Sequence, residues 1–382
     1  MSSPSFNGMS FNGDVSTVSF CHHEGASVYN LKATDPVLFS EIYELPQTMA
    51  NPNMQIADRI TTSNYLFLVC QQYPTQLMVY DVRQNTVYRT INFSYPIRVI
   101  KHNSQRVAIC SDYNLQICAL KDVKLLHTIS LNRYNTPGLF DLSFSDRSLI
   151  VYPTAVPGQI CLFDAINLKP IRVIKAHQTA VTALKLSLDG SLLATASHKG
   201  TVIRVTDTRT GEILFNFCRS LMREAEVCSL CFSPDNHYLV ASSKTGTVHL
   251  FELRETSEPK AITNITENLG LGVVGSYISS YFPNFAAQAE QYIPEPITRP
   301  KSIATCRLQP GYMTAVALKV MNGVPIIFVG SENGDLDIFR YADAVDCEHL
   351  AHWTLGQFRT QRSNRCSEDS DNSTFSNLSS SS

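Results

Sequence analysis

The sequence is poor in charge. Asp, Glu, Lys and Arg make up 17% of its 382 residues, and the formal net charge is -2. A charge balance so close to zero argues against the general attraction to nucleic acid or to acidic membranes that a strongly basic chain shows. We therefore expect no nucleic-acid partner, and anion binding through local groups alone.

Long apolar stretches are missing as well. We find no apolar run of 18 residues, the length that a bilayer-spanning helix requires. The first residues, MSSPSFNGMSFNGDVS, lack the basic flank and apolar core of a signal peptide. These features predict a cytoplasmic protein, in which the eleven cysteines stay reduced and act mostly as small core hydrophobes.

Motifs for catalysis and for metal binding are also lacking. The sequence shows no nucleophile elbow, phosphate-cradling loop or paired metal motif. The lone pair Cys228 and Cys231 lies on a predicted strand, VCSLCF, where a separation of three should place the two side chains on opposite faces. We therefore expect no enzyme, no metal and no cofactor.

What the sequence does contain is a repeated hairpin. Two near copies, SLLATASHKGTVIRVTDT (191–208) and HYLVASSKTGTVHLFEL (237–253), each join an apolar strand to a second, alternating strand through a Gly-Thr turn. Weaker copies of the same plan occupy residues 18–31, 65–82, 106–122, 148–165 and 325–341.

The spacing of the copies predicts the fold. The second strands of the middle units end at Asp81, Leu120, Asp164, Asp207 and Glu252, which follow one another at intervals of 39 to 45 residues, about the length of a four-stranded propeller blade. Short β-rich runs after the hairpins, such as TVYRTINF, LLHTISL and PIRVIKA, would supply the fourth strands. The pattern predicts an all-β, seven-bladed, WD40-like β-propeller.

The domain limits follow from the same pattern. The last interval is doubled, which predicts an insertion of roughly residues 255–300 between the third and fourth strands of blade 6. We expect residues 13–358 to form the propeller, and residues 1–12 and the serine-rich tail 359–382 to be disordered. Whether the chain before Asn30 begins the first blade or completes the last one stays open.

Two consecutive stretches carry a family resemblance. AHQTAVTALKLSLDGSLLATASHKGTVIRV and EILFNFCRSLMREAEVCSLCFSPDNHYLVASSKTGTVHLF resemble blades 5 and 6 of the PROPPIN (WIPI) proteins, seven-bladed propellers that bind phosphatidylinositol 3-phosphate and phosphatidylinositol 3,5-bisphosphate in autophagy. The family signature Phe-Arg-Arg-Gly directs its two arginines into two separate lipid pockets. Here it reads Phe217-Cys218-Arg219-Ser220, so the resemblance implies that the first pocket lacks its arginine and the second keeps Arg219.

The resemblance implies the site residues one by one. The first lipid site would use His177, Ser197, Gly200, Thr201 and Arg204, and the second would use Arg219, Ser242, Ser243, Thr247 and His249. Guanidinium groups and hydroxyls suit a phosphomonoester. A structural interpretation stays open beside this one, because Ser and Thr at turns commonly cap their own backbone and a histidine before a propeller strand often belongs to a structural network.

The loss of one phosphate-pairing arginine should weaken the first site. A hydrogen bond to a charged group contributes about 1.5–3 kcal/mol, which corresponds to one or two orders of magnitude in affinity. Arg209, Arg223, Lys199 and Lys244 are near in sequence and are candidates to compensate.

The insertion offers a second membrane contact. Between Glu267 and Glu290 the chain is uncharged, and a helix there would carry one apolar stripe. The resemblance implies that this loop enters the bilayer, whereas a loop packed over the side of the propeller is the alternative. The stripe and its neighbours are Leu269, Val273, Val274, Tyr277, Ile278, Tyr281 and Phe282.

The implied function is that of a non-enzymatic, monomeric phosphoinositide effector, peripheral on preautophagosomal and endosomal membranes, that scaffolds autophagosome formation. Its implied protein partners belong to the autophagy conjugation or lipid-transfer machinery, and a basic groove around blades 2 and 3 would receive a conjugation-complex subunit. Arg98, Lys101, Arg106, Lys121 and Lys124 supply basic character there. The alternative is a protein-interaction scaffold with weakened or lost lipid binding, and an enzyme is the least supported class.

Overall fold

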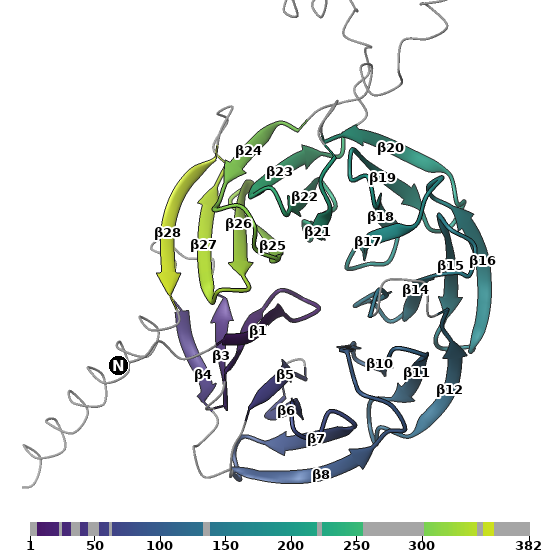
Figure 1. Ribbon diagram of the computed structural model, residues 1–382, viewed down its shortest axis with the longest axis vertical. Coiled ribbons are helices and arrows are strands. Elements are labelled where there is room, and N and C mark those ends of the chain that lie inside the picture. The colour runs from purple at the N-terminus through teal and green to yellow at the C-terminus, as the bar shows by residue number, and fades with distance from the viewer. Residues whose placement is uncertain are drawn as a thin grey trace, which may run out of the picture.

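The computed structural model describes residues 6–22, 25–31, 39–44, 53–60, 63–132, 138–219, 224–254, 302–341 and 347–354. These residues form 28 β-strands in seven four-stranded antiparallel sheets. The sheets stand around a ring, each with its first strand toward the centre and its fourth strand at the outside (Figure 1). The predicted seven-bladed propeller is confirmed.

Each blade consists of four consecutive strands, as follows. Blade 1 holds β1 (Phe6–Phe11), β2 (Thr17–His22), β3 (Gly25–Leu31) and β4 (Phe39–Glu44); blade 2 holds β5 (Met54–Arg59), β6 (Tyr65–Cys70), β7 (Gln76–Asp81) and β8 (Thr86–Asn92); blade 3 holds β9 (Val99–His102), β10 (Arg106–Cys110), β11 (Asn114–Ala119) and β12 (Leu125–Ser130); blade 4 holds β13 (Asp141–Leu142), β14 (Leu149–Pro153), β15 (Gln159–Asp164) and β16 (Lys169–Lys175); blade 5 holds β17 (Val181–Leu186), β18 (Leu192–Ser197), β19 (Val202–Asp207) and β20 (Ile213–Cys218); blade 6 holds β21 (Val227–Phe232), β22 (Tyr238–Ser243), β23 (Thr247–Glu252) and β24 (Ala304–Arg307); blade 7 holds β25 (Thr314–Met321), β26 (Val324–Ser331), β27 (Asp335–Arg340) and β28 (Glu348–Thr354).

The seven predicted hairpins are the second and third strands of the seven blades. Along these inner strands the side chains either alternate between buried and partly exposed or are buried on both faces, because each blade packs between two neighbours. Several third strands end in an aspartate that caps the following turn. Asp81, Asp164 and Asp207 each accept two backbone N–H bonds from the residues two and three positions further on.

The turn glycines of three hairpins have positive φ and press against the connection to the next blade. A Cβ on Gly158 would lie 2.0 Å from the carbonyl oxygen of His177, and one on Gly200 would lie 1.9 Å from that of Ala225. In blade 6, Gly246 stands in the same relation to Leu308, at 2.6 Å. The close contact explains why glycine is required at these turns as well as tolerated.

Among the described strands, the ring closes between blades 7 and 1 without exchange. The open question about the chain before Asn30 is thereby answered, because β1 to β3 belong to blade 1. Residues 6–11, which we expected outside the propeller, form β1, the first strand of that blade. Its apolar residues Phe6, Met9 and Phe11 are interrupted by Asn7, Gly8 and Ser10 without strict alternation, so its own sequence carries a weak strand signal, and pairing with β2 decides its structure.

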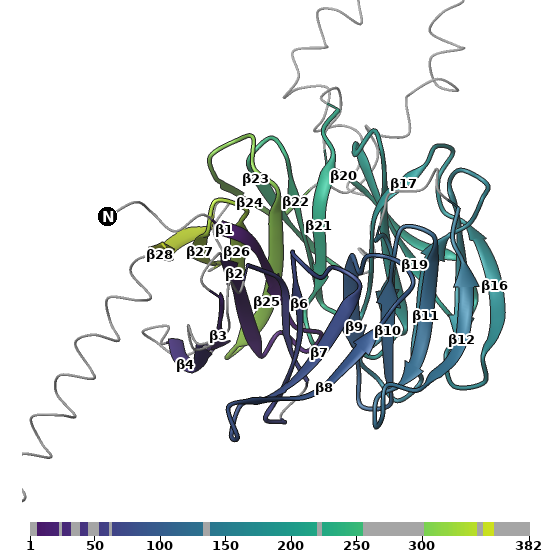
Figure 2. The ribbon, with the colours of Figure 1, turned by 60° about the horizontal axis from the view of Figure 1, so that its bottom comes forward.

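Closure depends on side chains. One apolar cluster joins Val18 and Phe20 of blade 1 to Leu318 and Ile327 of blade 7 and continues into blade 6. The ammonium group of Lys319 on β25 also donates to the carbonyl of Leu31 at the end of β3. Figure 2 shows the ring more from the side, with the strands of the blades running across its thickness.

The insertion lies where we predicted it, between β23 and β24, the third and fourth strands of blade 6. Its residues 255–300, with the predicted membrane-inserting stripe from Leu269 to Phe282, lie outside the described residues, as does the tail 359–382. Among the residues that are described, no helix is long and apolar enough to span a membrane.

Candidate functional site at the junctions beside blade 5

Blade 5 shares an interface with blade 4 on one face and with blade 6 on the other. The apolar cluster toward blade 6 contains Ala196, Ile203 and Phe217, whereas Leu193 belongs to the cluster toward blade 4. Because side chains alternate along a strand, the residues of β18, β19 and β20 divide between the two junctions. The two candidate sites therefore fall on opposite faces of the same blade.

The alternation of β20 supports the division of the signature motif between the two sites. Phe217 packs toward blade 6, so Cys218 faces blade 4, where it pairs with Val202 of β19. Cys218 is buried, with 3% of its surface exposed. The thiol thus lies on the face of blade 5 that is turned toward blade 4.

Arg219 follows directly after β20 and lies against the hairpin turn of blade 5. Its backbone N–H donates to the carbonyl of Thr201 at 2.9 Å, and its Nε donates to the carbonyl of Gly200. The residue is 8% exposed. The carbonyl of Gly200 therefore holds the guanidinium, and the carbonyl of Thr201 holds the backbone of the same residue.

The charge of Arg219 affects the pKa of a histidine in blade 6. Burial of the His249 side chain on β23, together with the nearby positive charge of Arg219, lowers the pKa of His249 to about 4. The imidazole is thus neutral at pH 7. Its Nδ1 lies 3.1 Å from the hydroxyl of Ser302, at the end of the insertion.

Three hydroxyls meet in the hairpin turn of blade 6. The Oγ of Ser243 lies 2.9 Å from the Oγ1 atoms of both Thr245 and Thr247, and these two threonines are 3.2 Å apart. We call these three residues the hydroxyl cluster. Thr245 was missing from the sequence prediction, although its place in the turn SSKTGT was a signal that could have included it.

The sheet register separates one predicted residue from the others. Ser243 pairs with Thr247, and Ala241 pairs with His249, so these residues share the face toward blade 5. Ser242 points to the opposite face, where its buried Oγ has no hydrogen-bond partner among the described residues. The structure therefore brings Arg219, Ser243, Thr247 and His249 to one junction and places Ser242 on the side of blade 7.

At the first site two of the predicted side chains, His177 and Arg204, have hydrogen-bond partners within the fold. The Nε2 of His177 lies 3.0 Å from the Oγ1 of Thr195, and His177 is buried. Arg204 donates through Nε to the Oδ1 of Asn216 at 3.0 Å and through Nη1 to the carbonyl of Ala176. These contacts are what the structural interpretation of His177 expects. Ser197 is also buried, and Gly200 and Thr201 form the turn.

The candidate compensating cations fall into two groups. Arg209 lies in the turn between β19 and β20, at the other end of β19 from Thr201, and so is remote from both sites. Lys199 lies in the hairpin turn of blade 5 and Lys244 in that of blade 6, beside the candidate sites. Each is paired with a carboxylate, Lys199 with Glu224 and Lys244 with Glu226. Arg223 lies outside the described residues.

Three of the five cations expected around blades 2 and 3 have polar partners within the fold. Arg98 holds Asp112 with two hydrogen bonds of 2.8 Å, and Arg106 donates to the carbonyl of Ala165. Lys101 lies 2.6 Å from the buried carboxylate of Asp141, which also faces Lys185 at 3.4 Å. Lys121 and Lys124 are exposed.

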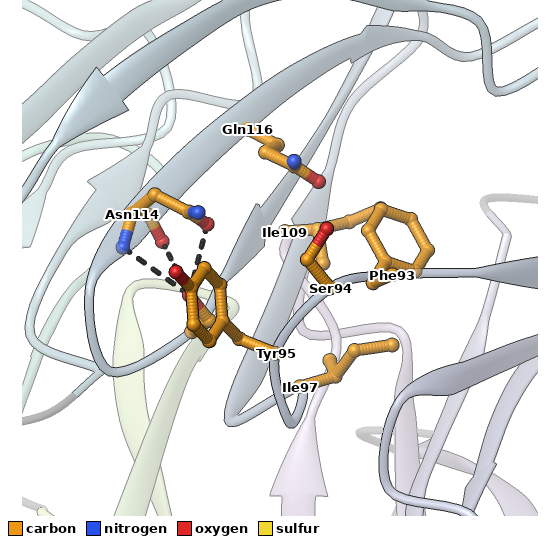
Figure 3. Close-up of a pocket in the computed structure, with 8 residues that line it drawn as sticks. Phe93, Ser94, Tyr95, Ile97, Ile109, Asn114 and Gln116 are labelled. Carbon is orange, nitrogen blue, oxygen red and sulfur yellow. Dashed lines mark hydrogen bonds between the residues drawn. The ribbon is translucent and has the colours of Figure 1, made fainter.

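A small hollow lies where blades 2 and 3 meet (Figure 3). Tyr95 stands at its edge and contacts Tyr113, with 5.1 Å between ring centroids. Its lining residues are Phe93, Ser94, Tyr95, Ile97, Ile109, Ser111, Asn114 and Gln116.

The cysteine pair departs from our expectation of opposite faces. A β-bulge between Val227 and Ser229 interrupts the alternation of β21. As a result both thiols face blade 7, Cys228 beside Met313 and Cys231 beside the backbone of Leu318. Burial raises the pKa of both thiols, and within the described residues no group of three or more His, Cys, Asp or Glu side chains could hold a metal ion.

Comparison with known proteins places the chain in a family. Residues 5–352 match the family model described as PROPPIN. The chain belongs to the PROPPIN family. It is 32% identical over 333 residues to WD repeat domain phosphoinositide-interacting protein 2 of Gallus gallus, covering 86% of this chain and 74% of that protein. It is 31% identical over 346 residues to Autophagy-related protein 18 of Caenorhabditis elegans, covering 88% and 82%.

Solved structures of PROPPIN-like propellers share the fold. Kluyveromyces lactis Hsv2 superposes with a TM-score of 0.69 at 18% identity, covering 92% of this chain and all of that one. A complex of KlAtg21 with the coiled-coil of AgAtg16 gives a TM-score of 0.70 at 19% identity, covering 92% of this chain and 99% of that one.

Proposed function

We propose that this PROPPIN is a non-enzymatic effector that binds a 3-phosphorylated phosphoinositide, phosphatidylinositol 3-phosphate or 3,5-bisphosphate, and scaffolds autophagosome formation. The observation that carries the proposal is the position of Arg219, held between the turn of blade 5 and the His249 side of blade 6. Relatives at about 30% identity are named as phosphoinositide-interacting and autophagy-related proteins. The headgroup phosphate would bind at the junction of blades 5 and 6.

The chemistry of that junction suits a phosphomonoester. The guanidinium supplies fixed positive charge, the hydroxyl cluster supplies donors for the remaining oxygens, and neutral His249 supplies an N–H or an acceptor. The second site is thus the principal one. At the first site Cys218 stands where the family signature has an arginine, so this site contributes less.

The insertion is the proposed second anchor. Its apolar residues 269–282 would enter the bilayer while the headgroup occupies the junction, and two weak contacts with one membrane add through effective concentration. The contact of Ser302 with His249 supports the pairing, because it ties the end of the insertion to the second site.

Replacement of Arg219 by alanine tests the lipid site. Sedimentation with vesicles that contain phosphatidylinositol 3-phosphate should show a loss of affinity of about tenfold or more, from the loss of a charge-assisted hydrogen bond. Arg209→Ala, an exposed arginine at the other end of blade 5, is the matched control and should bind like the wild type. Arg219→Lys and a circular dichroism spectrum separate loss of contact from loss of fold.

A scaffold without lipid binding is the second candidate function. The burial of Cys218 and the carboxylate partners of Lys199 and Lys244 favour it. Equal binding of the wild type and Arg219→Ala to vesicles with and without the 3-phosphorylated lipid would establish it in place of our proposal. The hollow between blades 2 and 3 would then be the first surface to test for partners of the autophagy conjugation or lipid-transfer machinery.

A further inference from the structure

The chain segment 224–226 runs between the two candidate sites. It connects β20 of blade 5 to β21 of blade 6. The backbone N–H of Ala225 donates to the carbonyl of Lys199 in the turn of blade 5, at 3.3 Å. The backbone N–H of Lys244 in the turn of blade 6 donates to the carbonyl of Glu226, at 3.1 Å. The segment is thus attached to both hairpin turns that carry the sites.

Its two acidic side chains reach the lysines of those turns. The Nζ of Lys199 lies 3.7 Å from the Oε1 of Glu224, and the Nζ of Lys244 contacts the Oε2 of Glu226. The hydrogen bond and charge of Glu226 raise the pKa of Lys244. Lys199 directly precedes Gly200 and Thr201 of the first site, and Lys244 separates Ser243 from Thr245 in the hydroxyl cluster. The lysines nearest the two sites are therefore already bound to carboxylates.

We propose that Glu224 and Glu226 are specificity-determining residues that compete with anionic lipids for Lys199 and Lys244. This inference rests on the proposed lipid-binding function. Both ion pairs are solvent-exposed, so each is weak and a strong competitor displaces it.

The competition selects for a phosphomonoester. A phosphomonoester carries about −1.5 to −2 charges and three acceptor oxygens, so it binds a lysine better than a carboxylate does. A phosphodiester or carboxylate headgroup, such as that of phosphatidylserine, has no such advantage. The two glutamates thus weaken binding to ordinary anionic membranes, and this penalty on the wrong ligand increases the specificity.

The test compares two kinds of vesicle at equal net charge. One contains phosphatidylinositol 3-phosphate, and the other contains phosphatidylserine. Glu224→Gln and Glu226→Gln should each tighten binding to phosphatidylserine vesicles about two- to fivefold, from the release of an exposed ion pair, and should tighten binding to the phosphoinositide by a smaller factor. Glu212→Gln, an exposed glutamate at the other end of blade 5, has the same charge change and should alter neither.

A second pair of variants tests whether the glutamates act through the lysines. In a Lys244→Gln background, Glu226→Gln should no longer tighten binding, because the competed cation is gone. Binding that depends on Arg219 but does not change with either glutamine variant overturns this inference and leaves the lipid site intact. Failure of the wild type to prefer the phosphoinositide vesicles overturns both.

Discussion

At the scale of single residues, Arg219 and His249 show how one side chain sets the charge of another. The histidine is held partly out of water and lies near a guanidinium, and both effects favour its neutral form. At pH 7 the candidate headgroup site thus has one fixed cation and a neutral ring beside it. Phosphate binding should therefore not depend on titration of this histidine between pH 6 and 8.

The same shift predicts how His249 affects stability. Its folded-state pKa of about 4 lies below the ordinary value near 6.5, so the unfolded chain binds the proton first as the pH falls. Stability should fall between pH 6.5 and pH 4, and His249→Gln should reduce that fall by on the order of 1 kcal/mol at pH 5. Urea midpoints at pH 7.5 and pH 5 measure it.

His198→Gln provides the control, since His198 is an exposed histidine in the turn of blade 5. If His249→Gln and His198→Gln give the same midpoints as the wild type at both pH values, His249 is solvated and our account of its environment is wrong.

At the scale of elements, the turn glycines can meet two requirements at once, a left-handed backbone conformation and close packing against the connection to the next blade. Gly200 has a φ of 60°, and a Cβ there would also meet the backbone oxygen of Ala225. Gly323, in the turn between β25 and β26, has a φ of 79° but open space around it. At both positions an L-residue would be strained by the left-handed conformation, and at Gly200 alone of the two its Cβ would also collide with the backbone of the next connection.

Alanine at each position separates the two effects. Gly323→Ala should lose about 1–2 kcal/mol, the cost of placing an L-residue in the left-handed region. Gly200→Ala should lose a further 1–3 kcal/mol or so, because the connection to blade 6 must move. Urea unfolding of the two variants gives the difference. Equal losses would show that the turn and the connection can separate at no cost.

The hairpins could be predicted from the sequence, whereas the details of their sites could not. A turn signal followed by an alternating strand is a local pattern, clearest in the two hairpins with a Gly-Thr turn, and it marked the two middle strands of all seven blades. The face that Ser242 occupies depends on which residue opposes it on β23, and the bulge at Cys228 depends on β22. Such register is decided by pairing between strands, which no single strand encodes.

The electrostatics of the site were equally beyond the sequence. Lys199 and Lys244 were plausible compensating cations by their position along the chain. Their pairing with Glu224 and Glu226 appears when residues 18 to 25 positions apart meet across two blades. The fold was thus predictable from repeated local patterns, but the net charge at each site required the three-dimensional arrangement.

At the scale of the whole molecule, the seam between blades 7 and 1 distinguishes this ring. The chain itself links the blades at the other six junctions, whereas blades 7 and 1 come from opposite ends of the chain, and no described strand is shared across their seam. Apolar packing around Phe20 and the bond from Lys319 to Leu31 close it instead. The seam should therefore be the junction at which the ring opens first.

The single tryptophan allows this to be measured, because Trp353 lies on β28 of blade 7 and packs against the cluster of the seam. Phe20→Ala removes a fully buried ring and should cost about 3–5 kcal/mol. In this variant the urea transition of Trp353 fluorescence should then precede the transition in far-ultraviolet circular dichroism, which reports on all seven blades. Phe251→Ala, which empties an equally buried position between blades 5 and 6, should lower both transitions together. Coincident transitions in Phe20→Ala would mean that the seam is as cooperative as the other junctions, and that side-chain packing alone closes the ring as firmly as a shared strand would.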